Sequence, residues 1–327
     1  MPRRILAIDG GGLKGMFAAN FLATVEDAIG SPVADYFDLI AGTSSGGIIA
    51  LGLGLGHSPA ELVAFYEREG PVIFAGNPIV RSLRRFLVSK YSHQPLRTVL
   101  TRIFGDRRLG ESRRRLLIPS LNLATGLIRV YKTAHHPQLE RDSAEKVVDV
   151  ALATVSAPTY FPIFTSRQGT PLVDGSMWAK NPVGMAVIEA VGVLGWPRDQ
   201  LKVLSLGCTT APLPVRWGRR LALGTGYWGN RIADVFMEAQ SSSALVTAQV
   251  LAGYDNVLRV DPTAGEREFE LDAVGKLPKL RDMGEAEAKR LLPLLKHAFF
   301  DAPAEPFTPC RPAEDGGEGI VTRLVGT

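Results

Sequence analysis

The sequence predicts an α/β fold in three layers, with helices on both faces of a central, mostly parallel sheet. Short and continuously apolar runs bounded by glycine are typical of buried strands. They alternate with segments whose apolar residues recur every three or four positions. Of the 327 residues, 46% are hydrophobic and 21% charged, so the chain is long enough to bury a large core. Added helices towards the C-terminus are expected to pack on that core.

The N-terminal part alternates strand and helix. Ser58, with Glu61 three residues later, predicts a capping box at the start of a helix. One segment that carries five glycines is ambiguous by propensity, and its place directly after a strand favours a helix. The predicted elements are a strand at 4–8, a helix at 15–29, a strand at 36–42, a helix at 45–56 and a helix at 58–69.

The same alternation continues after an irregular stretch. Residues 78–115 are rich in arginine and lack a steady period, which predicts an insertion of helices and loops. Thr125-Gly126 is typical of a turn between paired strands. The predicted elements are strands at 116–124 and 127–133, a helix at 144–156, a strand ending at 171–175, a helix after Pro182, a strand at 201–207, and helices within 217–253 and 284–300.

The chain is predicted to have three parts. Residues 1–210 form the α/β core, including the arginine-rich insertion. Residues 211–300 complete that core with packed helices. Residues 301–327 are rich in proline, glycine and acidic side chains, which predicts an extended or flexible tail.

Charge, cysteine content and hydropathy indicate where in the cell the protein is expected and which partners it could bind. The net charge of +4 fits anionic partners only weakly. Cys208 and Cys310 are too few for a disulfide framework, which favours a reducing compartment. The first apolar run stops at Asp9, too short for a signal peptide, and residues 48–56 fall far short of the roughly 20 apolar residues of a membrane span. A cytoplasmic protein, peripheral at the inner membrane surface, is expected.

The stretch ILAIDGGGLKG contains a glycine pattern with two interpretations. Gly10, Gly12 and Gly15 spell G-x-G-x-x-G, which is typical of a dinucleotide-binding loop when an acid follows the second strand. Here Asp35 and Asp38 precede the second strand. The dinucleotide-binding oxidoreductase is therefore kept only as a remote alternative.

A second glycine pattern points to acyl transfer. Gly42-Thr43-Ser44-Ser45-Gly46 spells G-x-S-x-G between a strand and a helix, the setting of a nucleophile elbow. Ser44 is the candidate nucleophile. The N–H groups of residues 10–12 and of Ser45 would then form an oxyanion hole for the developing negative charge. Asp174, at the end of a predicted strand and before Gly175, is the candidate general base.

Four motifs in this order resemble the patatin-like phospholipase family: DGGGLKG, GTSSGG, ATVSAPTYFP and DGSMWAKNP. The resemblance covers about residues 3–210. It implies the patatin-like three-layer acyl hydrolase fold and a Ser44–Asp174 dyad without catalytic histidine, metal or cofactor. It also implies an oxyanion loop at Gly10, Gly11 and Gly12 and a basic position at Lys14. Ser176 departs from the glycine or alanine that usually follows Asp-Gly in the family.

The predicted activity is hydrolysis of fatty-acyl esters of glycerophospholipids at a membrane surface. Alternatives stay open at two points. One of the five histidines could complete a triad, because triads assemble in space. Ser143 and Lys146 also spell S-x-x-K, which is interpreted as a helix start capped by Asp142 or Ser143. The oligomeric state, a homo-oligomer included, is left open, and no nucleic-acid polymer is expected as a partner.

Three groups of arginines raise the question of regulation. They could be solvated surface, a docking face for anionic headgroups, or a pocket for a phosphorylated regulator. The length and the helical region after residue 217 resemble bacterial patatin-like effectors that cyclic nucleotides activate in antiphage defence. This resemblance implies a cyclic nucleotide activator as an alternative mode of control. The groups are Arg81, Arg84 and Arg85; Arg107, Arg108, Arg113, Arg114 and Arg115; and Arg216, Arg219 and Arg220.

Overall fold

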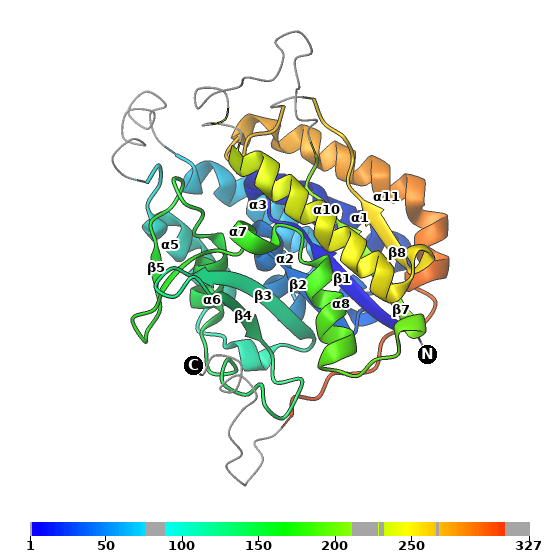
Figure 1. The fold of residues 1–327 in the computed structure, drawn as a ribbon. Helices are drawn as coiled ribbons and strands as arrows, with labels where there is room; N and C mark the ends of the chain where they lie inside the picture. Colours follow the sequence, from blue (N-terminus) through cyan, green and yellow to red (C-terminus); the bar gives the residue numbers. More distant parts are fainter. Residues whose placement is uncertain (1, 76–88, 211–227, 229–231, 266–267, 311–327) are drawn as a thin grey trace.

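The computed structural model describes residues 2–75, 89–210, 228, 232–265 and 268–310. Its centre is an eight-stranded sheet with helices on both faces (Figure 1). The predicted three-layer α/β class is confirmed. From one edge to the other the strands are β5 (Phe164–Thr165), β6 (Pro171–Asp174), β3 (Arg115–Asn122), β2 (Leu39–Gly42), β1 (Arg3–Ile8), β7 (Leu201–Leu206) and β8 (Val257–Val260), and β4 (Ile128–Lys132) pairs with β3.

The middle of the sheet is parallel and one side is antiparallel. β1 pairs in parallel with β2 and β7, β2 with β3, and β7 with β8. β4 and β6 both run antiparallel to β3, and β5 runs antiparallel to β6. The predicted turn at Thr125-Gly126 joins β3 to β4, with Gly126 at φ +70°. Because β1 and β2 are parallel and adjacent, the loops that follow them leave the same edge of the sheet.

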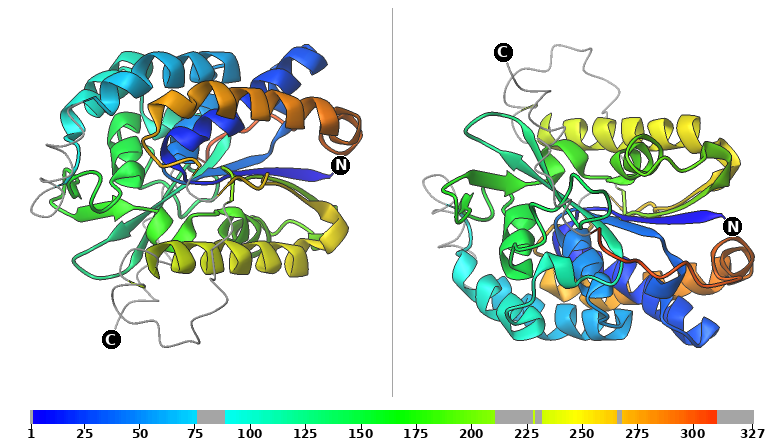
Figure 2. Two further views of the ribbon diagram at one scale, coloured as in Figure 1. Left: turned by 90° about the horizontal axis from the view of Figure 1, so that it is seen from above. Right: turned by 90° about the horizontal axis from the view of Figure 1, so that it is seen from below.

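Two apolar layers hold the helices on the sheet, one on each face (Figure 2). The larger layer joins alternate β1 residues, Leu6 and Ile8, to six helices, and the smaller joins Ile5 and Ala7 to two others; the short helix α7 (Ser176–Ala179) is in neither layer. This alternation follows from the period of two in a strand. The larger layer contains α1 (Gly15–Ile29), α2 (Ser45–Gly54), α3 (Pro59–Ile73), α5 (His93–Phe104), α6 (Val147–Val155) and α11 (Leu277–Phe299); the smaller contains α8 (Val183–Gly192) and α10 (Ile232–Ala252).

Several predicted elements are confirmed closely, and others required correction. α1 has the predicted bounds, and α3 begins at the predicted capping box of Ser58 and Glu61. β2 begins only at Leu39, because residues 33–36 form a 3-10 turn. Strand β8 was not predicted. Nor does a helix open at Ser143: α6 begins at Val147 after Lys146, without a side-chain cap.

The predicted insertion and tail are described only in part. Between residues 89 and 115 the chain forms helix α5, a 3-10 turn and connecting loops; residues 78–88 lie outside the described residues. Residues 301–310 contain neither helix nor strand, and 311–327 lie outside the described range. No described helix is long and apolar enough to span a membrane.

Candidate active site

Ser44 lies in the sharp turn between β2 and α2. Its φ of +52° and ψ of −122° are a conformation that L-residues rarely adopt, and such strain is typical of a nucleophile elbow. The two flanking glycines are required for steric reasons. A Cβ at Gly42 would lie 2.2 Å from the carbonyl oxygen of Gly46, and one at Gly46 would lie 2.3 Å from that of Ile8.

The structure brings Ser44 and Asp174 together from elements 130 residues apart in sequence. Ser44 Oγ donates a hydrogen bond of 2.7 Å to Asp174 Oδ2, and both side chains are buried. Asp174 ends β6, and its other carboxylate oxygen accepts the N–H of Ser176 at 2.7 Å. Ser176, the departure from the family pattern, therefore leaves this contact intact through its backbone.

The environment of Asp174 suits a general base. Burial raises the pKa of its carboxyl to about 6, and the hydrogen bonds from Ser176 and Ser44 oppose that rise. At neutral pH the group is still mostly ionised, yet it is far more basic than an exposed aspartate. It can therefore accept a proton from the Ser44 hydroxyl with which it is already hydrogen bonded.

The glycine loop after β1 lies beside the elbow, but its N–H groups differ in availability. Gly10 donates to the carbonyl oxygen of Lys180 at 2.9 Å, which removes it from the expected oxyanion donors. Gly11 donates to Ser45 Oγ at 3.1 Å. Within the described part of the chain, no hydrogen bond is found for the N–H of Gly12 or Ser45. Gly12 has φ +59°, and a Cβ there would lie 2.3 Å from the carbonyl oxygen of Leu271.

The other motif residues support this geometry by packing. Gly15 lies against the Tyr66 hydroxyl, which donates to the carbonyl oxygen of Ser45 at 3.1 Å. A Cβ at Gly175 would lie 2.3 Å from the carbonyl oxygen of Pro119. The Lys14 ammonium donates to the carbonyl oxygen of Thr209 at 3.4 Å.

One supporting residue was missed in the sequence. Thr154 Oγ1 accepts the N–H of Ser44 at 3.0 Å and donates to the carbonyl oxygen of Pro119 at 2.6 Å. The side chain thus connects the elbow to β3. Thr154 belongs to the ATVSAPTYFP motif, so the motif carried the signal although no role was assigned to this position.

No histidine touches the dyad. All five histidines are described, and none is hydrogen bonded to Ser44 or Asp174. His93 contacts Ser156 Oγ at 2.9 Å, and burial together with Arg97 lowers the pKa of its ring to about 4. Among the described residues, no group of three or more metal-ligating side chains is found.

The acids needed for dinucleotide binding lie at the other end of the sheet. Asp38 accepts the N–H of Arg4 at the start of β1, and Asp35 pairs with Arg114. The glycine loop follows the opposite end of β1. Asp35 and Asp38 are therefore not placed to bind a ribose beside the glycine loop.

The described arginines do not form one pocket. Arg107 binds Glu111, Arg114 binds Asp35, and Arg115 lies over the rings of Trp196 and Phe307. These contacts are separate, so this group is dispersed over several partners. Of the three arginine groups, the members that lie outside the described residues are Arg81, Arg84, Arg85, Arg216, Arg219 and Arg220.

Comparison with known proteins identifies the family. The model of the patatin-like phospholipase family matches residues 6–187, more than half of the chain. The chain belongs to the patatin-like phospholipase family. Its matched region contains the serine elbow, the glycine loop and Asp174.

Relatives of this patatin-like chain occur in bacteria and plants. A cGAMP-activated phospholipase of Pseudomonas aeruginosa is 36% identical over 296 residues, which are 88% of each chain. One of the same name from Vibrio cholerae is 38% identical over 227 residues, which are 62% of this chain and 63% of the relative. Patatin-like protein 1 of Arabidopsis thaliana is 29% identical over 86% of this chain and 80% of its own length.

Proposed function

We propose that this patatin-like protein hydrolyses fatty-acyl esters of glycerophospholipids with a Ser44–Asp174 dyad. The observation that carries the proposal is the 2.7 Å hydrogen bond between Ser44 Oγ and Asp174 Oδ2 at a strained strand-to-helix turn. A nucleophile in contact with a base of raised pKa is the arrangement that acyl transfer requires. Membership of the family supports the lipid substrate.

In the first half-reaction, Ser44 Oγ attacks the ester carbonyl while its proton passes to Asp174 Oδ2. The carbonyl oxygen becomes an oxyanion. The N–H groups of Gly12 and Ser45 are the donors proposed to receive it, with Gly11 joining them if it exchanges its bond to Ser45 Oγ. Collapse of the intermediate breaks the ester C–O bond, and the leaving alcohol takes the proton from Asp174. An acyl-enzyme and a lysolipid result.

In the second half-reaction, Asp174 accepts a proton from water, and the hydroxide oxygen attacks the acyl carbon. The new intermediate expels Ser44, which regains its proton from Asp174, and the fatty acid leaves. Each removed oxyanion donor is expected to lower kcat by a factor of about 100 to 1000. The reaction takes place at a membrane surface, consistent with a cytoplasmic, peripheral protein.

Replacing the nucleophile tests the chemistry. Ser44→Ala removes the attacking oxygen at a buried site, and the variant should keep the fold while losing nearly all fatty-acid release. The assay is release from mixed phospholipid vesicles, with circular dichroism as the control for folding. Retained turnover in Ser44→Ala would show that another group attacks the ester.

We further propose that a cyclic nucleotide switches this activity on. The support is the pair of relatives named cGAMP-activated phospholipase, the first of which matches 88% of this chain. A cyclic dinucleotide carries two phosphates, which arginine binds well. The test measures fatty-acid release from vesicles without nucleotide and with cGAMP, other cyclic dinucleotides or a cyclic trinucleotide. It separates gated from constitutive activity, and Ser44→Ala is the blank. Equal release without nucleotide would contradict the gating proposal and leave the hydrolase proposal intact.

A further inference from the structure

A partly buried arginine lies behind the glycine loop, on a strand that the family match does not reach. Arg259 is in β8, whereas the family model matches residues 6–187. The strand registers align Ala7 of β1, Ser205 of β7 and Arg259 of β8 in one row across the sheet. Because side chains alternate along a strand, the row shares one face, and Asp9 lies two residues beyond Ala7 on the same side.

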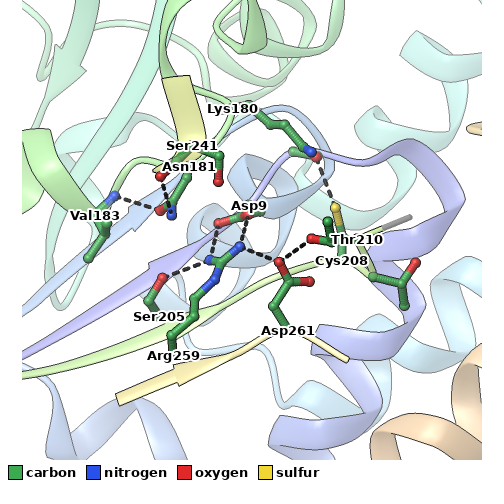
Figure 3. Close-up of polar contacts among 12 residues, drawn as sticks. Asp9, Lys180, Asn181, Val183, Ser205, Cys208, Thr210, Ser241, Arg259 and Asp261 are labelled. Atoms are coloured by element: carbon green, nitrogen blue, oxygen red, sulfur yellow. Dashed lines mark hydrogen bonds and ion pairs between the residues drawn. The ribbon is translucent and has the colours of Figure 1, made fainter. Parts of the chain in front are cut away.

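The Arg259 guanidinium binds Asp9 in a bidentate manner. Its two terminal nitrogens donate to Asp9 Oδ1 at 2.8 Å and to Oδ2 at 2.7 Å (Figure 3). The same nitrogens also donate to Ser205 Oγ at 2.8 Å and to Asp261 Oδ2 at 2.7 Å. The side chain of Ser205 is small, which lets the arginine lie across β7 to reach Asp9. Such a planar, two-point contact fixes orientation as well as distance.

Asp9 is the residue at which the glycine loop begins. Its N–H donates to the carbonyl oxygen of Leu206 at 2.9 Å, and Gly10 follows it directly. Residues 10–12 have no side chains with which to anchor themselves. Their position therefore depends on hydrogen bonds of the backbone and on the residues at the two ends of the loop: Asp9 at the start, and Leu13, whose N–H donates to the carbonyl oxygen of Leu271 at 2.8 Å.

The loop backbone is also held from behind. The Cys208 thiol donates to the carbonyl oxygen of Gly10 at 3.0 Å, and a Cβ at Gly11 would lie 2.3 Å from the same sulfur. Cys208 and Thr210 follow β7, and Thr210 Oγ1 donates to Asp261 Oδ2 at 2.5 Å. The carboxylates of Asp9 and Asp261 thus tie the loop and the segment after β7 to a single guanidinium.

We propose that Arg259 is a positioning residue of the acyl-transfer site, which fixes the Gly10–Gly12 loop through the carboxylate of Asp9. This inference rests on the function proposed above. An oxyanion donor acts only when it lies at hydrogen-bond distance from the developing charge, and a displacement of about 1 Å costs about 100-fold in rate. Arg259 touches no substrate in this role. It acts on kcat through the loop.

The test is Arg259→Lys in the full-length protein, with Arg4→Lys as the matched control. Arg4 is likewise an arginine of the sheet that is held by a carboxylate, that of Asp301, but it lies at the opposite end of β1. Lysine keeps the charge in both variants and removes the planar fork. We expect Arg259→Lys to lower kcat on phospholipid vesicles by about 10- to 100-fold, with KM changed less than about threefold. Arg4→Lys should lower the melting temperature and leave kcat unchanged.

A second readout is independent of membranes. An alkyl fluorophosphonate reacts with an activated serine: the hydroxyl proton passes to Asp174, an Oγ–P bond forms and the P–F bond breaks to release fluoride. The phosphoryl oxygen uses the same donors as an oxyanion. Intact-protein mass spectrometry gives the rate, with Ser44→Ala as the blank. Arg259→Lys should slow this labelling in parallel with kcat. If Arg259→Lys does not fold, Asp9→Asn, which keeps the shape of the side chain, should show the same loss.

The outcomes separate the two proposals. If Arg259→Lys melts lower, as Arg4→Lys does, but hydrolyses lipid and reacts with the fluorophosphonate at the wild-type rate, Arg259 has a structural role only. If the wild-type protein neither hydrolyses vesicles under any nucleotide condition nor labels at Ser44, the proposed function fails and the positioning role fails with it.

Discussion

At the scale of single residues, Asp174 combines two consequences of burial in one carboxyl group. Removal from water raises its pKa to about 6, and the Ser44 hydroxyl remains hydrogen bonded to it. The raised pKa makes the group a stronger base. It also makes the ionised form costly to the folded protein. Catalysis and stability therefore respond to pH in opposite directions at this residue.

The activity should depend on the ionised form of Asp174. We expect kcat/KM to fall about tenfold for each pH unit below about 6, because only the carboxylate can accept the proton of Ser44. The measurement is the pH profile of hydrolysis of a soluble ester. His93→Asn is the control, since His93 lies near the dyad without touching it. A shifted midpoint in that variant would assign the ionisation to the histidine.

Stability should change with the opposite sign. The folded pKa of Asp174 lies above the unfolded value, so its stabilising contribution is complete below pH 4 and is lost as pH rises through about 6. At pH 8 the buried charge costs roughly 3 kcal/mol. Asp174→Asn should therefore resist urea better than the wild type at pH 8, and the gap should close near pH 4. Equal stabilities at pH 8 would contradict this cost.

At the scale of elements, helix α11 packs against α1 at a glycine. Gly284 is buried, and a Cβ there would lie 2.6 Å from the carbonyl oxygen of Phe17 and 3.0 Å from the N–H nitrogen of Phe21. The close approach leaves no room for a side chain. The absence of a side chain at Gly284 therefore allows the two helices to approach closely at this point.

Replacing this glycine should force the helices apart. We expect Gly284→Ala to lower the free energy of unfolding by about 1–3 kcal/mol, as overpacking does. Gly192, at the end of α8, is the matched control, because a Cβ there would meet no atom of the described residues within 4 Å. Gly192→Ala should raise stability by about 0.5–1 kcal/mol through helix propensity. Urea denaturation of both variants decides between these effects, and stabilisation by both would refute the packing role.

Elements with a strong local signal were predictable from sequence. The periodicity of residues 15–29 and the capping box at Ser58 determine α1 and the start of α3 almost without tertiary context. β8 escaped prediction because its four residues, Val257–Val260, include Arg259 and so do not form a continuous apolar run. The arginine belongs there only because Asp9, 250 residues away in sequence, binds it.

The residues of the candidate site that belong to sequence motifs were predictable. The contacts that depend on the tertiary fold were not. The spacing of glycines around Ser44 and the position of Asp174 after a strand predicted the two side chains that the structure brings together. The hydrogen bond from the Gly10 N–H to the carbonyl oxygen of Lys180 could not be predicted, because it depends on how the segment after Asp174 folds back onto the loop. The role of Thr154 is likewise a matter of tertiary contact.

At the scale of the whole molecule, the tail crosses the end of the sheet that lies away from the dyad. Arg4 donates to the carbonyl oxygen of Ala302 at 2.8 Å, Arg3 binds Glu305 at 2.8 Å, and Ala304 donates to the carbonyl oxygen of Asp35 at 2.8 Å. Residues 301–310 thus bind the start of β1 and the segment before β2.

Removing this tail should affect stability more than catalysis. A chain ending at Phe300 leaves the buried Arg4 guanidinium without Asp301, and loss of one partner of a buried charge is strongly destabilising. We expect a lower melting temperature with kcat within about twofold of the full chain, because the dyad lies at the other end of the sheet. Differential scanning fluorimetry and the vesicle assay measure the two effects. A large fall in kcat with an unchanged melting temperature would show that the tail acts on the site.

The strand order also has a consequence for the time at which activity is acquired during protein synthesis. Asp9 leaves the ribosome before its partner Arg259, which is made 250 residues later. At about 5–20 residues per second, the two are separated by at least about ten seconds. Ser44 and Asp174 are both made earlier, yet the loop that serves them awaits β8. A nascent or prematurely terminated chain that lacks β8 is thus expected to carry its dyad with a much lower rate of hydrolysis of the membrane lipids of the cell that makes it.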